Sequence, residues 1–219
     1  VVTKEMYNLT DLGGNEFTLR PEGTAPVCRA FVEHGMHNLP YPLRLFYIEP
    51  MFRHERPQSG RMRQHHQFGV EIFGDNSPEA DAEIILVGLT YLKKLGIKNL
   101  KLRLNSIGNK NSREKFRKEF LDYFSPMKND LPEIDKKKFD LNPIRILDSK
   151  EKITMDLILK SPKPIEFLDD ESKKHWDKLQ IIINKIIDQF NDVDLVIDHN
   201  LVRGLDYYSM TVFEIEPAS

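Results

Sequence analysis

Residues 43–53 read LRLFYIEPMFR and residues 67–74 read QFGVEIFG, and their aromatic and β-branched residues predict two strands joined by a polar loop. Side chains alternate between the faces of a strand, so Gln67 and Glu71 share one face, with Gly69 between them. The opposite face of this strand carries only apolar residues and is predicted to be a core face: Phe68, Val70 and Ile72.

The polar face of this strand suits a small ligand. Gln67 and Glu71 offer an amide and a carboxylate two pleats apart, and Gly69 leaves room above the sheet. A ligand with amine or other N–H donors would use such a face, whereas an apolar ligand would not. The alternative is a half-solvated strand without a ligand, which is the commoner reason for a Gln-x-Gly-x-Glu pattern. The neighbouring loop favours the ligand.

That loop, residues 53–66, reads RHERPQSGRMRQHH and holds four arginines and three histidines. Arginine binds phosphate through two N–H groups at once and stays charged at any working pH, so the loop predicts a site for a nucleoside triphosphate. A charged loop that is merely solvated is the structural alternative. Zinc binding by His54, His65 and His66 is a weaker hypothesis, because their spacing matches no ordinary site and Cys28 is the only cysteine.

The other segments alternate between strand-like and helix-like patterns, which predicts an α+β fold. Further strands are expected at residues 4–9, 16–19, 100–104, 195–197 and 211–215. Thr24 is expected to cap a helix that runs to about Gly35, with an apolar face of Val27, Ala30 and Phe31. Ser77 is expected to cap a helix that ends at Gly96, with an apolar stripe of Ile84, Val87, Tyr91, Leu92 and Leu95.

Residues 110–188 differ from their surroundings, because they are rich in lysine and mostly helical in pattern. Their last helix carries one apolar face, made by Trp176, Leu179, Ile183, Ile186, Ile187 and Phe190. This block predicts a helical module inserted into the α+β domain.

The composition, 40 % hydrophobic and 30 % charged over 219 residues, is typical of a globular protein. The net charge of −2 gives no whole-chain footprint of a nucleic-acid binder, and residues 110–188 hold 18 Lys and Arg against 16 Asp and Glu. No apolar run approaches the roughly 18 residues that span a bilayer. A single cysteine excludes an internal disulfide, so a cytoplasmic location is expected.

Two further motifs contain candidate site residues: LRPEGT, which includes Glu22, and LVRGLDYY, which includes Arg203, Tyr207 and Tyr208. Each has a structural alternative. Glu22 precedes a helix N-terminus, where a carboxylate is favoured in any case. An arginine beside a glycine and two tyrosines is more often structural than catalytic. Because neighbouring side chains alternate, at most one of the two tyrosines is expected to face the ligand.

In their order along the chain, these motifs resemble the histidyl-tRNA synthetases, a group of class II aminoacyl-tRNA synthetases. MFRHERPQ at residues 51–58 is similar to the second class II signature motif, and LVRGLDYY at residues 201–208 is similar to a peptide peculiar to the histidine enzymes. NSIG at residues 105–108 and NPIRILD at residues 142–148 extend the resemblance over nearly the whole chain.

The resemblance implies that histidine is activated by ATP, with Mg²⁺, to histidyl-adenylate and then transferred to tRNA(His). Two catalytic arginines are implied on opposite sides of the α-phosphate, Arg53 and Arg203, with no metal site made by protein alone. The implied histidine-binding residues are Glu22, Gly23, Thr24, Arg53, Gln67, Glu71, Arg203, Tyr207 and Tyr208. The implied ATP-binding residues are Arg53, Glu55, Arg61 and His65. At His65 the family commonly has a phenylalanine that stacks on adenine, and histidine can stack as well.

The resemblance also implies a domain organisation. Residues 1–108 and 190–219 correspond to a discontinuous catalytic core with a class II sheet, and residues 109–189 to an inserted helical domain that approaches the tRNA acceptor stem. The first and third class II motifs would precede Val1 and follow Ser219, so these residues alone are expected to have little or no activity. The full-length protein is expected to be a homodimer.

Two other functions remain as alternatives. A synthetase paralogue without catalysis, either a regulatory subunit or a sensor of uncharged tRNA, would tend to lose members of the catalytic set. Here the set is present, including Glu22, Arg53, Gln67, Glu71 and Arg203, which favours the enzyme. A generic RNA-binding module would need a basic or aromatic surface, and the charge balance disfavours it.

Overall fold

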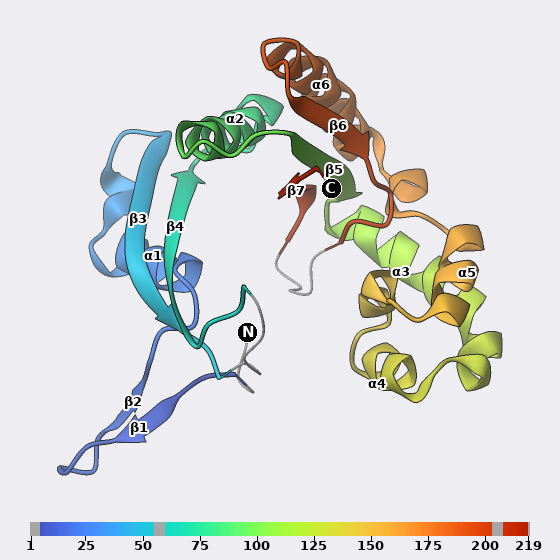
Figure 1. Ribbon diagram of the computed structural model, residues 1–219, viewed down its shortest axis with the longest axis horizontal. Helices are drawn as coiled ribbons and strands as arrows, with labels where there is room; N and C mark the ends of the chain where they lie inside the picture. Colours follow the sequence, from blue (N-terminus) through green and yellow to red (C-terminus); the bar gives the residue numbers. More distant parts are fainter. Residues whose placement is uncertain (1–4, 55–59, 203–207, 219) are drawn as a thin grey trace. The chain divides into compact units, whose positions relative to one another are not determined.

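The computed structural model describes residues 5–54, 60–202 and 208–218 (Figure 1). The chain folds into two compact units, Val1–Asn76 and Ser77–Ser219. Helices and largely antiparallel sheets are both present, which confirms the predicted α+β class. Within the described ranges, no helix combines the length and the apolar character needed to cross a membrane.

In its described residues, the first unit contains two antiparallel hairpins and one α-helix. Strand β1 (Asn8–Thr10) pairs with β2 (Glu16–Thr18), and β3 (Leu43–Phe52) pairs with β4 (Gln64–Phe73). Helix α1 (Thr24–Glu33) and the 3-10 turn η1 (Met36–Asn38) lie between the hairpins in the sequence. The strands predicted at residues 43–53 and 67–74 are confirmed, although β4 already begins at Gln64.

Helix α1 packs on the polar face of the β3–β4 hairpin. The rings of Phe31 on α1 and Phe73 on β4 are stacked with their centroids 4.4 Å apart. Phe68, Val70 and Ile72, which were predicted to form a core face, are only partly buried in this chain. Their neighbours on β3, Phe46 and Ile48, are 72 % and 62 % exposed. The reason is that the helix covers the other side of the hairpin.

The start of α1 also differs from the prediction. Thr24 is the first residue of the helix and its side chain makes no capping bond. The carboxylate of Glu22 accepts instead from the backbone N–H groups of Thr24 and Ala25, at 2.7 and 2.8 Å. A carboxylate at a helix N-terminus satisfies donors that have no partner within the helix, so Glu22 stabilises the start of α1. The predicted apolar face of Val27, Ala30 and Phe31 is the partly buried one.

The second unit is organised around β5 (Leu100–Gly108), the middle strand of a three-stranded sheet. Strand β6 (Val193–Ile197) pairs with β5 in parallel, and β7 (Met210–Pro217) pairs with it antiparallel. Because β5 is central, its apolar side chains are almost completely buried, each at most 1 % exposed: Leu100, Leu102 and Leu104. Helices α2 (Pro78–Lys94) and α6 (Asp170–Ile187) complete this core.

The apolar faces predicted for α2 and α6 differ in how well they match the structure. Ser77 caps α2 as expected, since its hydroxyl accepts from the N–H of Ala80 at 3.2 Å. The predicted stripe of α2 is wrong in most positions. Leu92 packs against the core, but Leu95 is 60 % exposed, and the fully buried residues of the helix are Ile85 and Leu89. The predicted face of α6 is confirmed, with Trp176, Leu179 and Ile183 buried and Ile186, Ile187 and Phe190 packed against them.

A second apolar cluster gathers the remaining helices. They are α3 (Lys110–Phe124), η2 (Ser125–Asp130), α4 (Glu133–Leu141), η3 (Pro143–Asp148), α5 (Lys152–Lys160) and η4 (Pro164–Phe167). The cluster centres on Phe116, Phe120 and Phe124, which lie one turn apart on α3 and are at most 2 % exposed. This confirms the mostly helical block, while the predicted boundary at residue 109 stays a proposal.

Candidate functional site

The first unit brings the predicted amino-acid-binding residues together above β4. The N–H of Gly23 donates to Oε1 of Gln67 at 3.1 Å, and the hydroxyl of Thr24 donates to Oε1 of Glu71 at 2.8 Å. As strand alternation predicted, Gln67 and Glu71 lie on one face of β4, and both bond to the same loop. The hydrogen bonds join this loop, residues 20–24, to the strand at two points.

The space above Gly69 is not open, contrary to the prediction. Tyr47 stands opposite Gly69 in the β3–β4 register, and its ring lies across the glycine. A methyl group built on Gly69 would lie only 2.1 Å from a carbon of that ring, and one built on Gly23 would also lie 2.1 Å from it. A ligand of this face must therefore lie beside or above Tyr47 rather than on the strand itself.

The electrostatics of this cluster favour a cationic or donor-rich ligand. Burial raises the pKa of Glu71, the hydroxyl bond from Thr24 lowers it in part, and the carboxylate of Glu22 raises it further. Cys28, an exposed residue of α1, has its pKa raised by slight desolvation of the thiol and then by Glu71 and Glu22. Two carboxylates are thus near enough to each other to interact, and a bound cation or N–H donor would relieve their repulsion.

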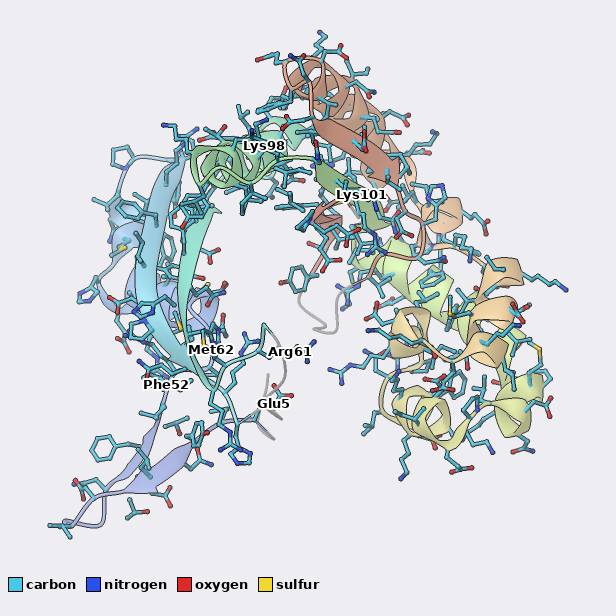
Figure 2. All side chains as sticks on the ribbon, in the orientation of Figure 1. Glu5, Phe52, Arg61, Met62, Lys98 and Lys101 are labelled. Atoms are coloured by element: carbon cyan, nitrogen blue, oxygen red, sulfur yellow. The ribbon has the colours of Figure 1, made fainter. Side chains whose placement is uncertain are left out.

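A basic hollow lies at the other end of the same hairpin. It has a volume of about 300 Å³ and is lined by Arg53, Gly60, Arg61, Met62 and His65. Figure 2 shows Arg61 and Met62 near the end of β3 that Phe52 marks. The Nε of Arg53 donates to the carbonyl of Pro21 at 2.7 Å, which fixes the direction of the guanidinium.

The two ends together form a strip with opposite charges. His65, Gln67 and Glu71 share one face of β4, and at about 3.3 Å per residue the strip spans about 20 Å along the strand. Carboxylates lie at one end, and arginines at the other. Such a strip fits a ligand, or two ligands in line, with donors at one end and phosphates at the other.

Comparison with known proteins gives the family. The family model for histidyl-tRNA synthetase matches residues 2–109. Histidine--tRNA ligases of Streptococcus pneumoniae (strain CGSP14) and Pediococcus pentosaceus are each 44 % identical to the chain over 98 % of its length, and over 49 % and 50 % of their own. The crystal structure of apo S. aureus histidyl-tRNA synthetase matches 96 % of this chain and 48 % of that one, with a TM-score of 0.73 and 34 % identity. The chain belongs to the histidyl-tRNA synthetase family.

The chain spans about half the length of the curated histidine--tRNA ligases it matches. A second solved structure is described as an ATP phosphoribosyltransferase regulatory subunit/histidyl-tRNA synthetase from Bacillus halodurans C. It matches 99 % of this chain and 58 % of its own, with a TM-score of 0.62 and 22 % identity, so it shows the shared fold alone.

Four predicted site residues are not among those described above. Glu55, Arg203 and Tyr207 lie outside the described residues. Tyr208 belongs to the second unit, where it is partly buried against the apolar cluster around Phe116. In the described part of the chain, His, Cys, Asp and Glu side chains form no group of three or more that could hold a metal ion.

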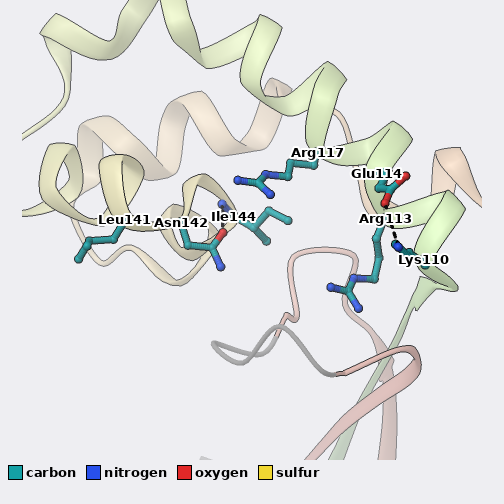
Figure 3. Close-up of a pocket in the computed structure, with 7 residues that line it drawn as sticks. All are labelled: Lys110, Arg113, Glu114, Arg117, Leu141, Asn142 and Ile144. Atoms are coloured by element: carbon teal, nitrogen blue, oxygen red, sulfur yellow. Dashed lines mark hydrogen bonds and ion pairs between the residues drawn. The ribbon is translucent and has the colours of Figure 1, made fainter. Parts of the chain in front are cut away.

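The second unit has a basic hollow of its own, of about 290 Å³, shown in Figure 3. It is lined by Lys110, Arg113, Glu114, Arg117, Leu141, Asn142 and Ile144. Three cations of α3 line this hollow, Lys110, Arg113 and Arg117, although Glu114 makes an ion pair with Lys110 at 3.9 Å. Arg113 also donates to the carbonyl of Tyr208. The near-neutral composition of this block therefore concealed a local cationic group.

Sequence reasoning missed Tyr47, Cys28 and the carbonyl of Pro21. In the sequence, Tyr47 is an even number of residues from Arg53, so alternation along the strand would have placed both side chains on the same face. Its importance depends on the register of β3 against β4, which places it opposite Gly69. Cys28 lies one helical turn after Thr24 and so faces the same side of α1.

Proposed function

We propose that the full-length protein is a histidine–tRNA ligase. It binds histidine, ATP and tRNA(His), forms histidyl-adenylate with release of pyrophosphate, and transfers the histidyl group to the 3′ end of the tRNA. The observation that carries the proposal is the strip of opposite charges on the β3–β4 hairpin, in a chain whose relatives are histidine--tRNA ligases.

The acidic end of the strip is assigned to the amino acid. Glu22, Thr24 and Gln67, with Gly23 between them, hold the ammonium group, and Glu71 accepts from an imidazole N–H. The family resemblance assigns Tyr208 to the other ring nitrogen and Tyr207 to the same histidine-binding set. The raised pKa of Glu71 supports this assignment, because a donor bound there would offset the cost of its buried charge. A site that satisfies both ring nitrogens rejects amino acids that lack them, since its own polar groups would be left unpaired.

The basic end of the strip is assigned to ATP. Arg53 bridges the histidine carboxylate and the α-phosphate, Arg61 contacts the distal phosphates, His65 stacks on the adenine, and Glu55 accepts from its amino group. The carboxylate oxygen attacks the α-phosphorus, and the bond to the leaving pyrophosphate breaks. Negative charge gathers on the phosphoryl oxygens in that step, so fixed cations lower the barrier, and the family resemblance assigns this role to Arg53 and Arg203.

The experiment is histidine-dependent exchange of pyrophosphate into ATP by the full-length protein. Arg53→Met is expected to lower the exchange rate by roughly 10²–10³-fold, as for the loss of one fixed group at a developing anion. Arg44→Met is the matched control, because Arg44 lies on the opposite face of β3. An Arg53→Met protein as active as the control would refute the assigned role.

The paralogue without catalysis is an outcome of the same experiment. If the full-length protein shows no exchange with histidine, yet is stabilised against heat by histidine, it is a histidine-binding protein and the proposed activity is wrong. Mg²⁺ bound with ATP, the homodimer and the cytoplasmic location belong to the same proposal and follow the family resemblance. The three cations on α3 support contact of the helical block with the tRNA backbone.

A further inference from the structure

We propose that Tyr47 is a positioning residue of the histidine site. Its ring is a spacer between the loop at residues 20–24 and strand β4, and the width of that gap decides how tightly histidine binds. The inference rests on the proposed function, because it concerns the same amino-acid end of the strip. No role for Tyr47 follows from the motifs that carry the resemblance.

Two glycines, Gly23 and Gly69, lie so close to the ring of Tyr47 that neither position has room for a Cβ. A methyl group on Gly69 would lie 2.1 Å from Cζ and 2.3 Å from the hydroxyl oxygen of Tyr47. A methyl group on Gly23 would lie 2.1 Å from Cε2 and 2.7 Å from the same oxygen. The tip of the ring is therefore held between the strand on one side and the loop on the other, and only glycine fits at either contact.

A cross-strand aromatic ring over a glycine is also a common way to stabilise a pair of strands. That role would explain Gly69 alone. It does not explain why Gly23, which lies in a loop rather than a strand, also packs so closely on the same ring that a Cβ would not fit. The second contact makes the ring a spacer between two parts of the site.

Two hydrogen bonds depend on that spacing. The Gly23 to Gln67 bond is 3.1 Å and the Thr24 to Glu71 bond is 2.8 Å, and they lie on either side of Gly69 along β4. Both bonds close the gap that the Tyr47 ring holds open. The loop can thus move neither toward the strand nor away from it, and the proposed ligand groups of Glu22, Gln67 and Glu71 keep one relative position. Groups held in this way bind a ligand at a smaller entropic cost, because they need not be ordered on binding.

The test uses size complementation in the full-length protein. Gly69→Ala adds a methyl group that overlaps the ring and forces the loop away from β4. It is expected to raise the KM for histidine in pyrophosphate exchange by roughly 10–100-fold, with kcat at saturating histidine and KM for ATP within about threefold of the parent. Tyr47→Leu removes the ring tip and is expected to raise the KM for histidine as well.

The double variant Tyr47→Leu with Gly69→Ala separates positioning from general damage. The added methyl group now occupies space that the ring has left, so the KM for histidine is expected to be no higher than in Tyr47→Leu alone. Phe46→Leu is the matched control, since Phe46 is the neighbouring aromatic residue on the opposite, exposed face of β3. Its KM for histidine should equal that of the parent.

Three results would overturn the inference. The first is a Gly69→Ala protein with the parent's KM for histidine. The second is a double variant whose defect equals the product of the two single defects, because the methyl group and the ring would then act independently. The third is a lowered kcat with unchanged KM, together with a lowered melting temperature, which indicates a purely structural role. If the parent itself shows no histidine-dependent exchange, the proposed function fails first, and the inference fails with it.

Discussion

At the scale of single residues, the charged carboxylate of Glu71 destabilises the folded protein in the absence of a ligand. Its carboxylate is half-buried, its pKa is raised by burial, and Glu22 adds a second negative charge close by. Thr24 supplies one hydrogen bond, which compensates only in part. A polar group of this kind weakens the fold in order to bind a ligand, and its removal should therefore stabilise the protein.

Glu71→Gln is expected to raise the melting temperature of the ligand-free protein at neutral pH. A carboxyl group whose pKa is raised by folding contributes its stability below its unfolded pKa, roughly 4.3, and loses it as the pH rises through the folded pKa. The gain from glutamine should therefore be largest at neutral pH and vanish below about pH 4. Thermal melts at several pH values measure it.

The same variant should lose its stabilisation by added histidine, because glutamine offers a weaker acceptor to the imidazole N–H. Glu33→Gln is the control for the loss of one charge from this unit, since Glu33 lies exposed at the end of α1. If Glu71→Gln has a lower melting temperature than the parent at neutral pH, the charged carboxylate of Glu71 does not destabilise the fold.

At the scale of elements, one buried carboxylate links several segments of the helical block. Asp135 on α4 is 0 % exposed and accepts from the hydroxyls of Ser149, after η3, and Thr154, on α5. Lys138 donates to its other oxygen at 3.0 Å. Burial by itself raises the pKa of Asp135, but these three partners outweigh it and hold the pKa below the usual range.

Asp135→Asn is expected to destabilise the helical block by about 1–3 kcal/mol at neutral pH, because a buried donor then lacks its charged acceptor. A carboxyl group with a lowered folded pKa gives stability above its unfolded pKa, roughly 3.9, and loses it as the pH falls through the folded pKa. The difference from the parent should therefore shrink on acidification. Urea unfolding followed by circular dichroism measures it at each pH.

Asp156→Asn is the matched control for that experiment, since Asp156 is an exposed residue of α5. It should unfold at the parent's urea concentration. Equal stability of Asp135→Asn and the parent at neutral pH would show that the network around Asp135 does not hold α4 and α5 together.

At the scale of the whole molecule, the second unit depends on the core beneath its central strand. Leu102 on β5 is 0 % exposed in the same apolar cluster as Trp176, the single tryptophan of the chain. Leu102→Ala is expected to cost about 3 kcal/mol, the sum of lost burial and the cavity left behind. Because Trp176 is itself buried, its fluorescence in urea reports the unfolding of this core.

Leu159→Ala is the corresponding control, because Leu159 is 72 % exposed on α5. Its unfolding midpoint should stay within the small range usual for surface changes, about 0.5 kcal/mol. If both variants unfolded at the same urea concentration, the β5 core would not limit the stability that Trp176 reports.

The sequence by itself determined the features that depend on near neighbours. Strand alternation placed Gln67 and Glu71 on one face, Ser77 and the residues after it marked the start of α2, and the apolar spacing of α6 gave its buried face. These follow from backbone geometry repeated every two or every 3.6 residues, so a short stretch of sequence contains the whole signal. The order of the motifs indicated the family that the comparison with known proteins gave.

Only the tertiary structure decided the features that depend on contacts with distant parts of the chain. Tyr47 lies at the proposed site because the β3–β4 register sets it against Gly69 and the loop brings Gly23 to its other side. The buried face of α2 was decided by the elements that pack on it, since the helix offers more than one apolar stripe. Glu22 kept the structural role that its position suggested, and it joined the site only because α1 starts above Glu71. Contacts between distant parts of the chain depend on register and packing, which no local pattern records.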